Sequence, residues 1–370
     1  MHDGGVSFFD RHPRVRWAVP AAAGLLVLAG TAIGTAGVSA DAGLPAKTAQ
    51  ELLVDLQSAE PGPVSGTVEI SSDLGLPDLS MLGGAGSTDP TSLLSGTHTL
   101  RVWSDGGANA RVDLLAERSE YDMVVNGQDV WLWDSSTSTV EHYVMPEGSP
   151  TKAPASEMSV PKTPQEAAEL VLTSIDPTTE VSVSGSGSVA GRPVYELSLT
   201  PRQDGTKIAR VVMSVDAETG SPLRVQAFSA VTQAPAFDVG FTTVDFTTPD
   251  ASVFAFTPPP GADVTEHSAT DGPTRGDGGS MASGPQPTMV GEGWTSVLVA
   301  AMPADQLTDN SSDSQASAAD LIQALPSVSG PWGSGRLLDG TLFSAIITDD
   351  GRMAVGAVTP EVLETALAQQ

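Results

Sequence analysis

The sequence predicts an α+β protein made mostly of antiparallel β-structure. Two trains of short runs rich in β-branched and aromatic residues cross the chain, with turn residues between the runs. An amphipathic helix is predicted in front of each train. Because so long a sheet with so few helices must still cover one of its faces, we expect the two helices and an apolar loop to fill the hollow of a curved sheet.

The N-terminus has the features of an export segment. Arg11, Arg14 and Arg16 precede an apolar stretch over residues 21–33, and Val38-Ser39-Ala40 offers small residues for a signal peptidase. Two interpretations stay open: a signal peptide, residues 1–40, cleaved near Ala40, or an uncleaved membrane anchor formed by residues 18–40. Both place the rest of the chain outside the cytoplasm, either secreted or held at the membrane.

The composition limits the classes of partner. There are 45 acidic and 17 basic residues, which gives a formal net charge of −28, and there is no cysteine. A surface of this sign repels phosphate backbones and anionic lipid surfaces, so we expect no nucleic acid partner. Without cysteine the chain has no disulfide, no thiolate chemistry and no lipidated lipobox, so its stability must come from packing.

The first train begins with a helix predicted over residues 48–60. Ala49, Leu52, Leu53 and Leu56 form one apolar stripe, and Thr48 and Glu51 have the spacing of a capping box. The predicted strands are Val64–Ile70, Gly96–Trp103, Ala110–Leu115, Tyr121–Val125, Asp129–Trp133 and Thr139–Val144. Asp105-Gly106-Gly107 and Asn126-Gly127 supply tight turns, so neighbouring strands should form an antiparallel meander.

An apolar stretch over residues 73–95 interrupts this train. Its large apolar side chains have neither strand nor helix period, and they are Leu74, Leu76, Leu79, Met81, Leu82, Leu93 and Leu94. A loop of this length is unusual inside a hairpin. It is either folded back onto the core or a mobile lid over an apolar cavity, and the sequence leaves both interpretations open.

The second train begins with a helix that Thr163 caps, with Pro164 in its first turn. Its predicted strands are Glu180–Val189, Val194–Thr200, Lys207–Val215, Leu223–Ser229, Phe237–Phe246 and Val253–Phe256. We therefore expect one domain over residues 45–262, a flexible linker over 263–287 and a small C-terminal α/β extension over 288–370. In the extension we expect a strand at Trp294–Ala301, a helical face made by Ala318, Leu321, Ile322 and Leu325, a hairpin from Leu342–Thr348 and Met353–Val358 around Asp349-Asp350-Gly351, and a last helix from Thr359-Pro360.

No catalytic or metal-binding pattern is present in the sequence. His98 and His142 stand on different predicted strands, without the spacing of a zinc site, and His267 falls in the predicted linker. There is no G-x-S-x-G elbow, no Walker loop and no calcium loop. We therefore predict a protein that is not an enzyme and that needs no cofactor and no metal.

The run of residues 129–133 is apolar on both sides. Trp131 and Trp133 alternate with Val130 and Leu132. Such a strand is either buried on both faces, or buried on one and lining an apolar cavity on the other. Where helices and loop fill the hollow incompletely, a pocket suited to acyl chains remains. The pocket or lid candidates are the seven apolar residues of the 73–95 stretch together with Met123, Val125 and Leu132.

Four segments resemble the LolA-like superfamily, which includes lipoprotein carriers, the LppX and LprG lipid-binding lipoproteins and the N-terminal domain of RseB/MucB regulators. They are residues 129–143, 193–202, 213–229 and 241–264. The resemblance covers residues 45–265 and implies an unclosed, curved half-barrel of about eleven strands with helices on its concave side. It also implies that lipid, or the acyl chains of a lipoprotein, bind on that face.

Two departures from the superfamily stand out. The chain lacks the lipobox cysteine of the lipid-binding lipoproteins. The arginine that shuts the lid of the carriers has no equivalent at a matching place, and only Arg101, Arg111 and Arg118 lie in the same region.

The sequence thus favours a non-catalytic, extracytoplasmic protein that binds or transfers acyl-bearing lipid or lipoprotein in an apolar concave pocket. An alternative is an RseB-like regulatory module that binds an anti-sigma factor or another membrane protein. The ordered region after residue 285, which a simple carrier does not need, motivates that alternative.

Overall fold

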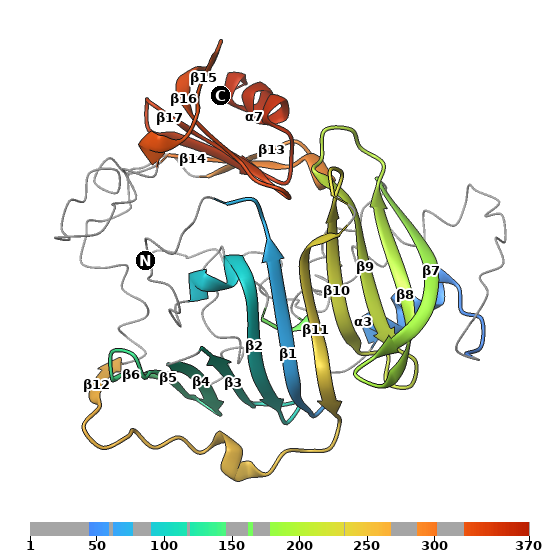
Figure 1. The fold of residues 1–370 in the computed structure, drawn as a ribbon, viewed down its shortest axis with the longest axis vertical. Helices are drawn as coiled ribbons and strands as arrows, with labels where there is room; N and C mark the ends of the chain where they lie inside the picture. The colour runs from blue at the N-terminus through green and yellow to red at the C-terminus, as the bar shows by residue number, and fades with distance from the viewer. Residues whose placement is uncertain are drawn as a thin grey trace, which may run out of the picture.

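The structure, a computed structural model, describes residues 44–58, 62–76, 90–116, 119–145, 162–165, 178–232, 234–267, 287–301 and 322–369. A large curved sheet forms most of the molecule, and a smaller sheet with a helix sits at one end of it (Figure 1). The large sheet does not close into a barrel, because its two end strands, β12 and β7, do not pair with each other. The predicted fold class, an open and mostly antiparallel half-barrel, is confirmed.

The large sheet has twelve strands in the order β12-β6-β5-β4-β3-β2-β1-β11-β10-β9-β8-β7. Their bounds are β1 Val64–Asp73, β2 Ser95–Ser104, β3 Asn109–Leu115, β4 Glu120–Asn126, β5 Asp129–Asp134, β6 Thr139–Val144, β7 Thr179–Val189, β8 Arg192–Pro201, β9 Ile208–Asp216, β10 Pro222–Ser229, β11 Pro235–Asp245 and β12 Asp263–His267. Neighbouring pairs are antiparallel except for β12, which runs parallel to β6. The two predicted trains thus meet where β1 pairs with β11.

Turn residues hold the meander in register. Gly106 and Gly127 have φ values of 81° and 64°, a conformation that glycine adopts without strain. The carboxylate of Asp105 accepts a hydrogen bond from the Gly107 amide at 2.7 Å, which stabilises the turn between β2 and β3. The hairpins predicted from these residues are present.

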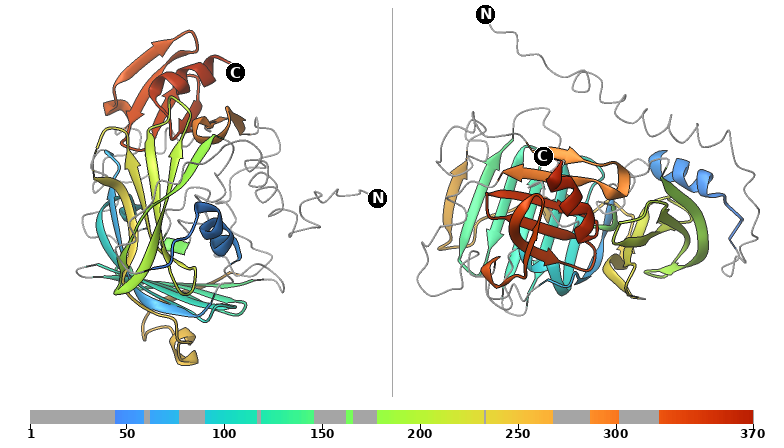
Figure 2. Two further views of the ribbon diagram at one scale, coloured as in Figure 1. Left: turned by 90° about the vertical axis from the view of Figure 1, so that its right-hand side faces the viewer. Right: turned by 90° about the horizontal axis from the view of Figure 1, so that it is seen from above.

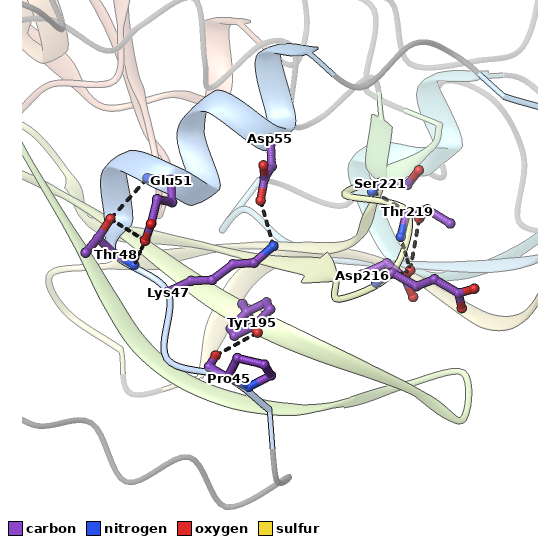
Figure 3. A network of polar contacts seen from close by, with 10 residues as sticks. Pro45, Lys47, Thr48, Glu51, Asp55, Tyr195, Asp216, Thr219 and Ser221 are labelled. Carbon is purple, nitrogen blue, oxygen red and sulfur yellow. Dashed lines mark hydrogen bonds and ion pairs between the residues drawn. The ribbon is translucent and has the colours of Figure 1, made fainter.

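Helix α3 (Ala49–Ser58) covers one face of the sheet, and Figure 2 shows it within the curve of β7 and β8. Its capping box is formed: the amide of Thr48 donates to Glu51 at 2.7 Å, and the amide of Glu51 donates to the Thr48 hydroxyl at 3.2 Å. Leu52 and Leu56 are buried in the main core. The side chain of Tyr195 on β8 also donates to the carbonyl of Pro45 at 2.7 Å, which fixes the chain entering the helix (Figure 3).

The C-terminal unit has a core of its own. Its six strands run in the order β13-β14-β18-β17-β16-β15, and helix α7 (Pro360–Ala368) packs on them. The strands are β13 Thr288–Val290, β14 Val297–Ala301, β15 Ser327–Gly330, β16 Gly333–Asp339, β17 Ser344–Thr348 and β18 Arg352–Gly356. Val297, Ile346 and Leu363 are fully buried in this core.

Polar contacts join the C-terminal unit to the large sheet. The Gln203 side chain accepts a hydrogen bond from the Trp294 amide at 2.9 Å and donates to the Glu292 carbonyl at 3.0 Å. The Trp294 indole donates to Thr179 on β7 at 2.8 Å. The amide of Thr341 donates to the carbonyl of Leu74 at 2.7 Å, so the unit also contacts the chain that leaves β1.

Three predicted elements differ in the structure. Residues 253–256 do not form a strand: the 3₁₀ helix η4 (Ala251–Phe254) is there instead, because the Asp250 carboxylate accepts from the Ser252 amide at 2.8 Å and caps a helical turn. Trp294 lies in the 3₁₀ helix η6 (Gly293–Thr295), and the strand starts only at Val297. The segment predicted as a linker begins with a strand, β12.

Some predictions fall outside the described residues. They concern the export segment, residues 77–89 of the apolar loop, all but the first two residues of the helix after Thr163, and residues 268–286 and 302–321. The described residues beside these segments include Pro164 and Gln165, which are helical, and a helical turn at residues 322–324. Among the helices of the described ranges, none combines the length and the apolar character that a membrane span requires.

Candidate ligand-binding site

Strand register places one set of apolar side chains on the face that α3 covers. Leu100 on β2 pairs with Val68 of β1 and with Leu114 of β3. Val112 on β3 pairs with Met123 of β4. Since directly paired residues point to the same side of a sheet, these five side chains share one face.

A shallow apolar hollow opens on this face over β2, β3 and β4. Its empty space is about 280 Å³, part of which is open to solvent. The residues that line it are Leu93, Leu100, Val112, Leu114, Tyr121, Met123 and Lys162. The hollow therefore lies under one half of the sheet, while α3 covers the other half (Figure 2).

The 3₁₀ helix η3 (Pro90–Leu94) forms one wall of the hollow. Its Leu93 side chain is fully buried, and the Leu93 carbonyl accepts a hydrogen bond from the buried hydroxyl of Ser72 at 2.8 Å. This bond ties η3 to the end of β1. The wall is thus part of the folded core.

The chemistry of the lining is that of an aliphatic binder. Apolar side chains make most of the surface, and Lys162 supplies the single cation of the lining. Small-molecule sites commonly have mainly apolar walls and a few polar groups, in pockets of about 300–1,000 Å³. This hollow has the same kind of lining but a cavity volume of only about 10 Å³, because most of the space between its walls is open solvent. It can therefore contact only a short part of a chain molecule.

The structure brings together two of the ten predicted pocket residues, Leu93 and Met123. Val125 and Leu132 lie on the same face, at register positions beside Met123, without lining the hollow. Leu94 is partly buried at the end of η3. The remaining five belong to the apolar loop: Leu74 and Leu76 are partly buried after β1, and Leu79, Met81 and Leu82 lie outside the described residues.

The sequence interpretation missed Leu100, Val112, Leu114, Tyr121 and Lys162. Four of them lie on predicted strands, and alternation along each strand shows which of its residues share a face. Pairing Leu100 with Leu114 in addition would have identified the face of the sheet that carries the hollow.

None of the arginines considered for a lid contact borders the hollow in the described structure. Arg111 pairs with Val124 and Arg101 with Asp113, which places both on the face opposite Leu100 and Val112. Arg118 lies outside the described residues. Arg111 has a different role, because it forms ion pairs with two aspartates.

A cluster of charges is buried on this opposite face. Asp113 and Asp122 are direct cross-strand neighbours, and Arg111 contacts them at 2.7 and 2.9 Å. Arg111 also donates to the carbonyl of Val253 in η4 at 3.5 Å. Burial, together with the repulsion from Asp113, raises the pKa of Asp122 to about 7.

The other half of the sheet has a differently balanced ion pair. Arg192 on β8 contacts the fully buried carboxylate of Asp216 at 2.5 Å. The amide of Thr219 also donates to Asp216, at 2.8 Å. Despite its burial, these hydrogen bonds hold the pKa of Asp216 below its usual value.

Metal chemistry has no support in the ordered ranges. No group of three or more histidine, aspartate or glutamate side chains there is arranged to hold an ion. The charged clusters that are present combine carboxylates with arginine or histidine, as ion pairs do.

Comparison with known proteins places the chain beside several solved structures. No protein-family model matches it, and neither does any curated protein. The MucA/MucB complex of Pseudomonas aeruginosa is similar over 86% of this chain and 96% of that chain, with 16% identity and a TM-score of 0.45. A LolA superfamily protein from Nitrosomonas europaea is similar over 57% of this chain and 99% of that chain, with 12% identity and a TM-score of 0.24.

An uncharacterized conserved protein from Thermus thermophilus is also similar. It covers 59% of this chain and 99% of its own length, with 14% identity and a TM-score of 0.33. Proteins of the LolA superfamily and MucB, which the sequence segments resemble, are therefore among the solved structures that this chain is similar to.

Proposed function

We propose that this protein binds acyl-bearing lipid, or the acyl chain of a lipoprotein, in the hollow over β2, β3 and β4, without catalysing a reaction. The observation that carries the proposal is an apolar lining that the described residues leave partly unfilled on the face of the sheet that is otherwise core. The export segment of the sequence supports an extracytoplasmic site of action.

The hollow suits a chain rather than a compact molecule. Each methylene moved from water to an apolar site contributes about 0.8 kcal/mol, so covering one or two methylenes against this lining gives about 1–2 kcal/mol. The open side leaves room for a head group in solvent. Lys162 at the lining favours a head group with negative charge.

The test uses the full chain and two matched variants. Val112→Trp fills the hollow, whereas Val231→Trp introduces the same side chain at a position that is 90% exposed. We expect Val112→Trp to weaken binding of a fluorescent fatty-acid probe at least about tenfold, since losing two buried methylenes already costs about 1.6 kcal/mol.

Val231→Trp should leave probe binding unchanged, and urea unfolding shows that each variant is folded. Mass spectrometry of organic extracts from the purified wild type should detect a co-purified lipid. A folded Val112→Trp protein that binds the probe as the wild type does would contradict the proposal.

A second candidate function is that of a regulatory module which docks on a membrane protein such as an anti-sigma factor. The C-terminal unit supports it, because it has its own core and exposes an edge strand, β13, with Met289 60% exposed. Exposed sheet edges accept strands from other chains.

Site-specific photo-crosslinking in cells separates the two functions. A crosslinking residue in place of Met289 should capture a membrane protein, and one in place of Val231, in the turn after β10, should not. If neither position captures a partner while lipid binding persists, the carrier function stands alone.

A further inference from the structure

Strand β12 is held on the edge of the large sheet with little burial. It pairs in parallel with β6 over five residues, from Asp263 beside Thr139 to His267 beside Tyr143. Four of its five residues are exposed, including the apolar Val264. Figure 1 shows the chain after β11 passing along the ends of the other strands before it reaches this edge. Hydrogen bonds and polar side chains, and not a core, therefore keep β12 in place.

His142 on β6 forms the main side-chain clamp. Its Nδ1 lies 2.6 Å from the Glu266 carboxylate on β12, and its Nε2 lies 2.9 Å from Asp129 on β5. His142 therefore links Glu266 on β12 to Asp129 on β5 through its two ring nitrogens.

His142 is packed against an aromatic ring and lies between two carboxylates. The ring stacks on Trp131 with 3.7 Å between centroids and 6° between planes, and its side chain is only 12% exposed. Asp129 and Glu266 are the charged groups that face it from β5 and β12, and Phe256, beyond η4, contacts Trp131 without charge.

The other face of the edge has a second stacked pair. Tyr143 on β6 stacks on His267 of β12 with 4.3 Å between ring centroids and 7° between planes. The hydroxyl of Tyr143 donates to Glu141 at 2.6 Å. The edge of β6 thus presents a backbone ladder, the His142 imidazole on one face and the Tyr143 ring on the other.

We propose that the outer edge of β6 is a binding site for an extended acidic segment of a partner protein, and that β12 occupies it in the free protein as an internal ligand. The segment that fits has a carboxylate opposite His142, followed by a planar side chain opposite Tyr143, as Glu266 and His267 show. A partner binds there by replacing β12 and adding a strand to the sheet. This site is independent of the acyl-binding hollow.

One consequence follows from the internal ligand. Because β12 is covalently attached, its high effective concentration lowers the apparent affinity of any competing segment.

The experiment frees the edge and then offers it a peptide. The amide of Asp263 donates to Ser138 at 2.9 Å, and alternation along the strand points the Thr265 amide to the same side. Thr265→Pro removes that donor from β12 and leaves β6 intact. The probe is a synthetic peptide with the sequence of residues 261–269, added to isotope-labelled full-length protein and followed by NMR at pH 5.5.

We expect the peptide to bind Thr265→Pro at least about tenfold more tightly than the wild type. A peptide with Gln in place of Glu266, or the double variant Thr265→Pro with His142→Gln, should lose about tenfold in affinity. The double variant Thr265→Pro with His98→Gln is the matched control, because His98 contacts only the Ser95 carbonyl among the contacts of the ordered chain, and it should bind as Thr265→Pro does.

Hydrogen exchange gives a readout that does not need the peptide. Amides of residues 263–267 should exchange faster in Thr265→Pro and in His142→Gln than in the wild type, after correction for intrinsic rates. A folded Thr265→Pro protein that ignores the peptide at pH 5.5, or that binds the Gln peptide equally well, overturns the proposal.

Discussion

Strands β7 to β11 and strands β2 to β6 lie on either side of β1 in one sheet, yet they bury their side chains to different degrees. In the first half Leu197, Met213 and Leu223 are fully buried, with Leu52 of α3 in the same core. In the second half Val112 and Met123 remain partly exposed and line a hollow. The same strand chemistry therefore gives a solid core or an open hollow, according to what covers it.

The two halves also treat a buried aspartate differently. Asp216 has an arginine and several hydrogen-bond donors, so its charged form is stabilised. Asp122 shares one arginine with Asp113, and one of its oxygens has no partner within the ordered part of the chain. One half thus stabilises the ionised carboxylate, and the other carries a carboxylate that binds a proton near neutral pH.

The largest expected effect comes from truncating the solid half. Leu197→Ala should lower the free energy of unfolding by about 2–5 kcal/mol, because it leaves a cavity in a closed core. Met123→Ala should cost only about 1 kcal/mol, since its side chain already borders open space. Urea unfolding of both variants measures the difference. Equal losses would mean that the hollow is as well packed as the core.

The next effect tests the ion pair of the solid half. Asp216→Asn should destabilise the protein by about 3 kcal/mol at pH 7, because it removes the buried anionic partner of Arg192 and breaks this ion pair. The folded pKa is lowered, so this contribution is complete above the unfolded pKa of about 4 and is lost as pH falls through the lower folded value. Unfolding curves of the variant and the wild type should therefore converge in acid. A difference that is constant with pH would contradict this.

The smallest effect has the opposite sign. The folded pKa of Asp122, about 7, lies above the unfolded value, so wild-type stability should fall as pH rises through the interval between the two. Asp122→Asn removes this dependence and should gain about 2–3 kcal/mol relative to the wild type between pH 5 and pH 8, as one unit of pKa corresponds to about 1.4 kcal/mol and about two units lie between pH 5 and the folded pKa. Thermal or urea unfolding across this pH range checks it, and a variant that loses stability toward pH 8 would exclude the assignment.

Local rules predicted much of the fold. The capping box at Thr48 and the turns at Gly106 and Gly127 are determined by nearby residues, and all three are present. Residues 253–256 were wrongly predicted as a strand, because a short apolar run does not distinguish strand from helix. The hydrogen bond from the Ser252 amide to the Asp250 side chain stabilises a helical turn there instead. Strand β12 could not be predicted for a related reason: it is mostly polar and exposed, so it lacks the alternation of apolar and polar residues that indicates a strand.

The candidate site depends on register, which one sequence specifies weakly. Asp113 and Asp122 meet, as do Val112 and Met123, only because β3 and β4 pair with one offset and not another. The contact between His142 and Glu266 joins residues far apart in the chain across a parallel pair that no turn connects. Such contacts follow from the strand topology, and no short-range sequence pattern predicts them.

The hydrogen bond from Ser72 to the Leu93 carbonyl closes the base of the segment that links β1 to β2. The two ends are therefore fixed by the sheet and by η3, whatever sequence joins them. Loop-closure entropy rises only slowly with length, so insertions or exchanges between these ends cost the fold little. An engineer could replace this connection with a foreign peptide and keep both the strands and the wall of the hollow.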